Sequence, residues 1–305
     1  MKFKVLYIAL FISSICVGQQ INSEEILITN DSIQLPGTLT YVKENTPLII
    51  WVHGSGNVDR NGNQQPIVKA NYIKQFRDLI NKEGIAFFSY DKRTSNKKNF
   101  RYLTGILFND LVKDVKKVIA HFNTEKRFSE IILIGHSQGS LVAMLASKNT
   151  SKYISIAGPS ESIDKTIITQ ITQQSVEFGE VAAAHFKELF KTGTIKQVNP
   201  FLASIFAKQN LEFIADYAKY SPTKELEKIK IPVLLINGTN DLQVTIKDAK
   251  TLHKARPNST LVLIDNMNHV LKNIEKDTDN MKSYYSANFQ LSTKLITTIV
   301  AFLKN

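Results

Sequence analysis

Residues 131–139 read IILIGHSQG, and this stretch decides the fold. Its first four residues are aliphatic, as in a strand buried on both faces of a parallel sheet. A helical pattern follows from Ser140 to Ser147. Gly135-His136-Ser137-Gln138-Gly139 is therefore expected on a sharp strand-to-helix turn, which presents the Ser137 hydroxyl at the carboxyl edge of the sheet. Glycines flank the serine because side chains would clash in so tight a turn. The alternative is an ordinary glycine-rich turn.

Apolar runs with strand character alternate with helical patterns along the rest of the chain. This alternation predicts right-handed crossovers and an α/β fold, with a mostly parallel central sheet flanked by helices. A hairpin is expected first, over Glu24 to Val42, with turns at Asn30-Asp31 and Pro36-Gly37. The other expected strands are residues 47–52, 85–90, 131–134, 153–157, 232–236 and 261–264, and the expected helices are residues 71–81, 108–122, 140–147, 246–255 and 291–303.

One stretch, residues 160–225 or so, breaks the alternation. It has helical periodicity and no strand candidate, and it is too long for a plain loop. We expect a helical cap inserted between two strands of the sheet. Its phenylalanines either roof a substrate pocket or pack the core of the cap itself; they are Phe178, Phe186, Phe190, Phe201, Phe206 and Phe213.

A serine hydroxyl is a poor nucleophile unless a histidine takes its proton. In this kind of fold the catalytic groups follow the chain order serine, acid, histidine. Three histidines follow Ser137. His185 lies in the expected cap and His253 in an expected helix, whereas His269 lies just past the last strand. Only His269 is expected at the sheet edge that carries Ser137, so it is the predicted general base.

Two aspartates could orient that histidine, and both follow strands. Asp241 ends the loop Asn237-Gly238-Thr239-Asn240-Asp241, and Asp265 ends the last strand. We prefer Asp241, because its glycine-containing loop can bring a carboxylate under the imidazole. The alternative reading of Asp265 is a plain residue at the end of a strand.

A tetrahedral intermediate also needs hydrogen-bond donors for its oxyanion. His53-Gly54-Ser55-Gly56 follows the strand at residues 47–52 and predicts a tight loop with exposed backbone. The expected donors are the backbone N–H groups of Ser55 and Gln138, with the loop donor uncertain by one position. His53 is expected to hold the loop through its ring nitrogens.

Four charged residues follow two successive strands. They are Asp59, Arg60, Asp91 and Arg93. One hypothesis is an ion-pair bracket that fixes the oxyanion loop. The other is that they are independent surface charges.

The first eighteen residues have the layout of a secretory signal peptide. Lys2 and Lys4 precede an apolar run, and small residues follow it. Such a segment is too short for a stable membrane span. A buried N-terminal strand is the alternative. Cleavage after Gly18 leaves residues 19–305 as the mature hydrolase domain and predicts a secreted or periplasmic protein. Acylation of Cys16 is disfavoured because Ile15 stands where a small residue is expected.

Composition limits the remaining functions. Cys16 is the only cysteine, so the mature protein would have no disulfide, thiol nucleophile or thiolate metal site. The formal net charge of +11 becomes +9 without Lys2 and Lys4. The basic residues are scattered, which indicates a solvated basic surface rather than nucleic-acid binding. After the leader, no segment is long and apolar enough to span a bilayer.

The four motifs HGSG, GHSQG, GTND and NH, each placed after a strand, resemble the α/β-hydrolase superfamily. Within it, HGSGNVDRNGN and the later SYDKR are similar to a bacterial esterase group with an HGSG…DR loop. The resemblance implies an acyl-enzyme mechanism with Ser137, Asp241 and His269 as the triad, without a cofactor or a metal. It does not carry over the family's substrates.

The sequence therefore predicts a serine hydrolase that cleaves a small-molecule carboxylic ester. A serine peptidase or amidase with the same triad is the first alternative. The second is a secreted binding protein that keeps the fold and has lost catalysis. The oligomeric state is not indicated.

Overall fold

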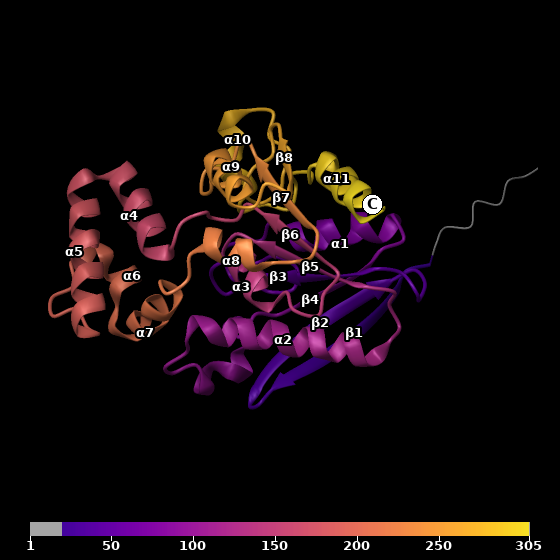
Figure 1. Ribbon diagram of the computed structural model, residues 1–305, viewed down its shortest axis with the longest axis horizontal. Helices are drawn as coiled ribbons and strands as arrows, with labels where there is room; N and C mark the ends of the chain where they lie inside the picture. Colours follow the sequence, from indigo (N-terminus) through magenta and orange to yellow (C-terminus); the bar gives the residue numbers. More distant parts are fainter. Residues whose placement is uncertain (1–19, 305) are drawn as a thin grey trace, which may run out of the picture.

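The predicted strands form one eight-stranded sheet in the computed structural model, which describes residues 20–304 (Figure 1). The predicted signal peptide lies outside the described residues and stays a prediction. Across the sheet the order is β1-β2-β4-β3-β5-β6-β7-β8. The pairs β1–β2 and β2–β4 are antiparallel, and all other neighbours are parallel. The strands are β1 (Asn22–Asn30), β2 (Ile33–Tyr41), β3 (Leu48–Val52), β4 (Ala86–Tyr90), β5 (Ile131–His136), β6 (Lys152–Ile156), β7 (Val233–Gly238) and β8 (Thr260–Ile264).

Helices cover both faces of this sheet, which confirms the predicted α/β-hydrolase architecture. Apolar side chains of α2 (Phe108–Glu125) and α3 (Gln138–Ala146) pack on one face. Those of α1 (Tyr72–Lys82) and α11 (Thr293–Lys304) pack on the other. Helix α9 (Ile246–Ala255) connects β7 to β8, and α10 (Asp277–Ser283), which the sequence did not predict, lies between β8 and α11.

Strand β3 shows why the central runs are continuously apolar. Leu48, Ile50 and Val52 belong to the core on one face of the sheet, whereas Ile49 and Trp51 belong to the core on the other. Successive side chains of a strand point to opposite faces, so a central strand covered twice needs apolar residues at every position. All five residues are buried.

The N-terminal hairpin forms, but one of its predicted turns is wrong. The chain reverses at Asn30-Asp31, where Asp31 has φ 53°. Pro36-Gly37 instead lies inside β2, with Pro36 opposite Leu27. A Cβ at Gly37 would come within 2.3 Å of the Phe88 ring on β4. The glycine therefore serves close strand packing, and not a turn.

The stretch in which the sequence predicts a cap contains helices and no strand among its residues, all of which the structure describes. Helices α4 and α5 pack against each other at the far left of Figure 1, beside α6 and α7. Phe186 and Phe206 are buried in a core of the cap's own, whereas Phe190 and Phe201 are exposed. The elements are α4 (Ile163–Gln174), α5 (Val176–Thr192), a 3₁₀ turn (Pro200–Leu202), α6 (Ala203–Phe206), α7 (Lys208–Tyr217) and α8 (Pro222–Lys228).

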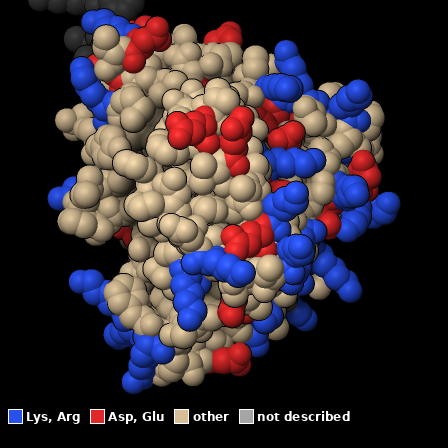
Figure 2. Space-filling view, turned by 90° about the vertical axis from the view of Figure 1, so that its left-hand side faces the viewer, with Lys and Arg blue, Asp and Glu red and all other residues tan. Residues whose placement is uncertain are grey.

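Charges are mixed on the face that carries the cap. Figure 2 shows lysines and arginines around the margin of this face, with aspartates and glutamates interspersed and much of the centre uncharged. Among residues 20–304, no helix is both long enough and apolar enough to cross a bilayer.

The charged residues after β3 and β4 support only part of the bracket hypothesis, because one of their ion pairs joins the two loops and the other leads to α2. Arg60 binds Asp91 through two side-chain contacts of 3.0 Å each. Arg93 instead binds Asp114 on α2, with two contacts of 2.7 Å. Asp59 accepts the backbone N–H groups of Asn61 and Asn63 in its own turn. Of the ion pairs that these four residues make, Arg60–Asp91 is the one that joins the two loops.

We predict that Arg93→Ala destabilises the fold strongly. Asp114 is 2% exposed, so removal of Arg93 would leave a buried carboxylate without its ionic partner. The expected loss is about 3–5 kcal/mol in the free energy of unfolding, measured by urea denaturation. Arg101→Ala removes an exposed arginine nearby and should change stability by less than about 0.5 kcal/mol. Equal unfolding midpoints for Arg93→Ala and the wild type would contradict the role of the buried pair.

Candidate active site

Ser137 lies on a strained turn between β5 and α3. Its backbone has φ 55° and ψ −124°, a conformation that residues with a side chain rarely adopt. The backbone N–H of Ser137 donates to the Ile156 carbonyl at the end of β6, at 2.9 Å. The sharp reversal and this anchor hold the serine at the carboxyl edge of the sheet, where the motif predicts it.

The glycines around this turn permit very close packing. A Cβ at Gly139 would lie 2.3 Å from the Val52 carbonyl oxygen at the end of β3, and one at Gly54 would lie 3.2 Å from the Ser137 Cβ. No other residue fits at Gly139 without moving backbone. The loop after β3 therefore lies directly against the nucleophile turn.

Asp241 and His269 are brought together from the loops after β7 and β8. The His269 Nδ1 and the Asp241 Oδ2 are 2.8 Å apart, and the two side chains are 6% and 1% exposed. The other oxygen of Asp241 accepts the backbone N–H groups of Gln243 and Val244, at 2.8 and 2.9 Å. These bonds hold the carboxylate in one orientation, so it directs the Nδ1 proton of His269 and leaves Nε2 toward the cavity.

Asp265, the alternative acid, is exposed at the end of β8. Among the described residues, its carboxylate has no hydrogen bond to His269. The geometry therefore favours Asp241 over Asp265.

Ser137 and His269 line the same cavity, whose volume is about 230 Å³. Tyr72, Tyr284 and Tyr285 also line it. Among the described residues, Ser137 Oγ and the His269 ring make no direct hydrogen bond. Such contacts commonly tighten only when substrate binds.

The other histidines occupy structural places. The His136 ring is buried between Trp51 and Tyr72, and its Nε2 lies 2.8 Å from the backbone oxygen of His269. Burial lowers the pKa of His136 to about 3. Burial likewise lowers the pKa of His53 to about 4, and its Nε2 contacts the Tyr90 carbonyl. Both rings are therefore neutral at pH 7.

The two histidines that sequence order set aside lie away from the sheet edge. His185 on α5 accepts the backbone N–H of Asn199 at 3.1 Å. His253 on α9 contacts the Ser259 hydroxyl at 2.9 Å. Neither residue lines the cavity that contains Ser137.

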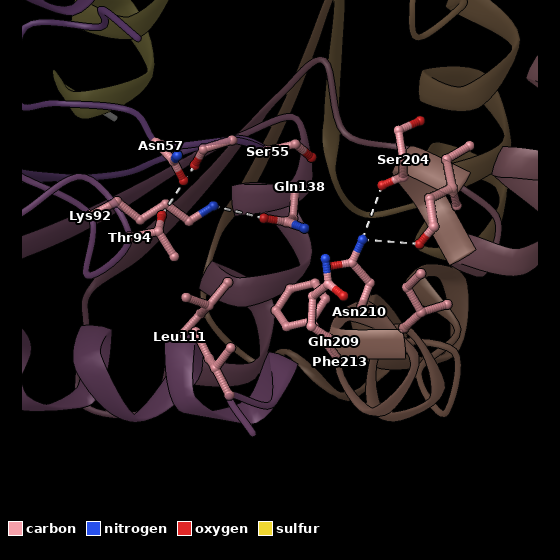
Figure 3. Close-up of a pocket in the computed structure, with 14 residues that line it drawn as sticks. Ser55, Asn57, Lys92, Thr94, Leu111, Gln138, Ser204, Gln209, Asn210 and Phe213 are labelled. Carbon is pink, nitrogen blue, oxygen red and sulfur yellow. Dashed lines mark hydrogen bonds between the residues drawn. The ribbon is translucent and has the colours of Figure 1, made fainter. Parts of the chain in front are cut away.

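The backbone N–H groups of Ser55 and Gln138 have no acceptor among residues 20–304. Gln138 is the first residue of α3, where helix geometry leaves the N–H groups without a partner. Both residues also line a second cavity of about 550 Å³ between the sheet edge and the cap, to which Leu111 and Phe213 contribute apolar surface (Figure 3). Two unpaired N–H groups beside a serine hydroxyl can stabilise a developing oxyanion.

Sequence reasoning missed one residue at this edge, Lys92. Its ammonium group is buried and donates to the Gly54 carbonyl at 2.8 Å. It also donates to the Gln138 Oε1 at 2.9 Å (Figure 3). Its place two residues after the apolar run of β4 was a usable signal, because functional groups gather at the carboxyl ends of parallel strands.

The structure also bears on metal binding. Among residues 20–304, no group of three or more histidine, cysteine or acidic side chains is arranged to hold a metal ion. The polar groups at the sheet edge are instead paired as described, with Asp241 bound to His269.

Sequence comparison gives relatives among esterases. The chain is 26% identical over 250 residues to Esterase EstD of Thermotoga maritima. The matched region covers 78% of this chain and 58% of that protein. The match thus spans less than two thirds of that relative.

Solved structures share the fold at lower identity. The match with Est1E from Butyrivibrio proteoclasticus has a TM-score of 0.59 at 17% identity and covers 92% of this chain and 99% of that one. Esterase Pf2001 of Pyrococcus furiosus matches with a TM-score of 0.62 at 17% identity, over 93% of this chain and 91% of that one. The model of the BD-FAE family matches residues 33–255, well over half of the sequence. The chain therefore belongs to the BD-FAE family.

Proposed function

We propose that the protein is a serine hydrolase that cleaves a small-molecule carboxylic ester, with Ser137 as nucleophile, His269 as base and Asp241 as its orienting acid. The observation that carries the proposal is the buried Asp241–His269 pair, which faces the cavity lined by Ser137. The relationship to Esterase EstD supports the choice of an ester as the substrate class.

In the first step, His269 takes the proton of Ser137 as the serine oxygen attacks the ester carbonyl. Asp241 stabilises the imidazolium that forms, through the 2.8 Å contact at Nδ1. The carbonyl oxygen becomes an oxyanion, which accepts the N–H groups of Ser55 and Gln138. His269 then protonates the leaving alcohol, and an acyl group remains on Ser137.

In the second step, His269 removes a proton from water, which attacks the acyl carbon. The acid leaves, and the proton returns to Ser137. This chemistry uses only side chains and backbone of the chain itself. His136 and His53 do not compete as bases, because burial holds both pKa values well below 6.5.

The two cavities supply room for the two parts of an ester. Ser55 lines both of them, with Ser137 and His269 in the smaller one and the cap residues of α6 and α7 in the larger one. A carbonyl held at Ser55 would direct its acyl and alcohol parts into opposite cavities. The larger cavity combines Phe213 and Ile214 with the amides of Gln209 and Asn210, which suits a substituent with both apolar and polar groups.

We predict that Asp241→Asn lowers kcat by a factor on the order of 10⁴, because the amide favours the wrong tautomer of His269. Asp265→Asn is the matched control, since this carboxylate is exposed. Its kcat should equal that of the wild type. Hydrolysis of p-nitrophenyl acetate measures both. A larger loss in Asp265→Asn than in Asp241→Asn would reverse the assignment of the acid.

Ser137→Ala should abolish ester hydrolysis, with kcat lower by about 10⁶-fold. A fluorophosphonate probe should label the wild type and not this variant. A native protein that the probe does not label, and that hydrolyses no p-nitrophenyl ester from acetate to palmitate, would be a binding protein instead. Faster turnover of aminoacyl-nitroanilides than of esters would indicate a peptidase.

A further inference from the structure

A buried lysine ammonium lies beside the proposed oxyanion donors. Lys92 is 7% exposed and is the second residue after β4. It makes two hydrogen bonds, one to each of the two loops that contain the donors: to the Gly54 carbonyl after β3 and to the Gln138 side chain after β5. Figure 3 shows the ammonium directed toward Gln138 at the edge of the larger cavity. No step of the proposed mechanism uses this group.

The bond to Gly54 fixes the direction of the Ser55 N–H. The carbonyl of Gly54 and the N–H of Ser55 belong to the same peptide group, which is planar and trans. In such a group the C=O and N–H bonds point in opposite directions. An ammonium bound to the oxygen therefore holds the N–H on the opposite side and polarises it, because donation to the oxygen draws electron density from the nitrogen.

The bond to Gln138 fixes the second donor. Gln138 follows the nucleophile, and its backbone N–H has no acceptor among the described residues. Its side chain is buried and bound to Lys92 at 2.9 Å, which restricts the first turn of α3. The loop after β3 and the turn after β5 are thus both bound to the ammonium group of Lys92.

We infer that Lys92 is a positioning residue of the oxyanion hole, which sets the distance between the Ser55 and Gln138 N–H groups and adds positive charge beside them. The inference rests on the proposed function, since it assigns a role within the same reaction. Lys92 does not touch the nucleophile, and it acts through Gly54 and Gln138.

The charge of Lys92 depends on its burial and on the few titratable groups that surround it. Burial lowers its pKa to about 7. In the loop after β3 it faces His53, which is neutral, and on α2 it faces Asp114, which Arg93 already binds. Tyr90 of β4 lines the same space and is uncharged, because burial raises the pKa of its hydroxyl. Next to it in the chain, Asp91 is bound to Arg60. Gln138 on α3 and the cap residues of the larger cavity are uncharged. The ammonium form is therefore present below pH 7 and lost as the pH rises above it.

The first test is Lys92→Met, which replaces the four-carbon stem by an unbranched apolar side chain of about the same length and removes the ammonium. We expect kcat for p-nitrophenyl acetate at pH 6.5 to fall about 10- to 100-fold with KM little changed, because oxyanion stabilisation acts in the transition state. Lys97→Met removes an exposed lysine at the start of the 3₁₀ helix that follows this loop (Lys97–Tyr102), and as the control it should retain the wild-type kcat. Thermal unfolding of each variant identifies any loss of fold.

The second test is the pH dependence of kcat/KM, which reports groups of the free enzyme. The wild type should lose activity as the pH rises through about 7, and Lys92→Met should lack this alkaline limb. Gln138→Glu places a carboxylate at the contact with Lys92. It should move the limb to higher pH whatever its effect on the absolute rate, because an opposite charge favours the ammonium form.

The outcomes separate this inference from the proposed function. If Ser137→Ala retains hydrolysis, the proposed function is wrong. If Ser137→Ala is inactive while Lys92→Met keeps the wild-type kcat, the inference alone is wrong. An alkaline limb that is unchanged in Gln138→Glu would also overturn it, even if Lys92→Met failed to fold.

Discussion

The close approach of the turn after β5 to the end of β3 is the constraint on which the rest of the site depends. At Gly139, the space for a Cβ is occupied by the Val52 carbonyl, 2.3 Å away. This contact puts the loop that starts at His53 next to Ser137, and the parallel register of β3 and β5 keeps their ends level. The strained backbone of Ser137 is tolerated because the Ile156 carbonyl and the first turn of α3 hold it from both sides.

Three consecutive charged residues after β4 then connect this edge to the rest of the fold. Asp91 binds Arg60 in the loop after β3, Lys92 binds Gly54 and Gln138, and Arg93 binds Asp114 on α2. A buried charge is stable only when it is paired or well hydrogen-bonded, so each of the three partners limits how far its loop can move. The proposed reaction takes place at the carboxyl edge of the sheet. The positions of the loops at that edge are set by these three charged residues and their partners.

Much of the fold could be predicted from the sequence, because the spacing of apolar residues and the residues typical of turns can both be recognised within short segments. Strands that are buried on both faces of the sheet appear in the sequence as apolar runs, and the glycines of GHSQG indicate the turn after β5. The positions of His269 and Asp241 also followed, since parallel strands bring their carboxyl ends to one edge. The turn predicted at Pro36-Gly37 was wrong because a glycine suits both a turn and close packing of strands. The contact with Phe88 on β4, which requires a glycine at position 37, is visible only in the structure.

The partners of the charged residues could not be predicted for a related reason. Arg93 and Asp59 are both charged and both follow strands, yet Arg93 reaches a carboxylate on α2, more than twenty positions along the chain. The buried state of Lys92 depends on the packing of β3, β5 and the cap around it, which no local pattern records. Helix α10 was missed because its seven residues are too few to show a period.

The most direct measurement is a crystal structure of the protein after reaction with a fluorophosphonate, whose tetrahedral phosphorus stands for the acyl transition state. We predict a bond from the Ser137 oxygen to phosphorus. A phosphoryl oxygen should lie about 3 Å from the N–H groups of Ser55 and Gln138, and His269 Nε2 should face the serine oxygen. Phosphorus on a different residue, or a phosphoryl oxygen out of reach of both N–H groups, would contradict it.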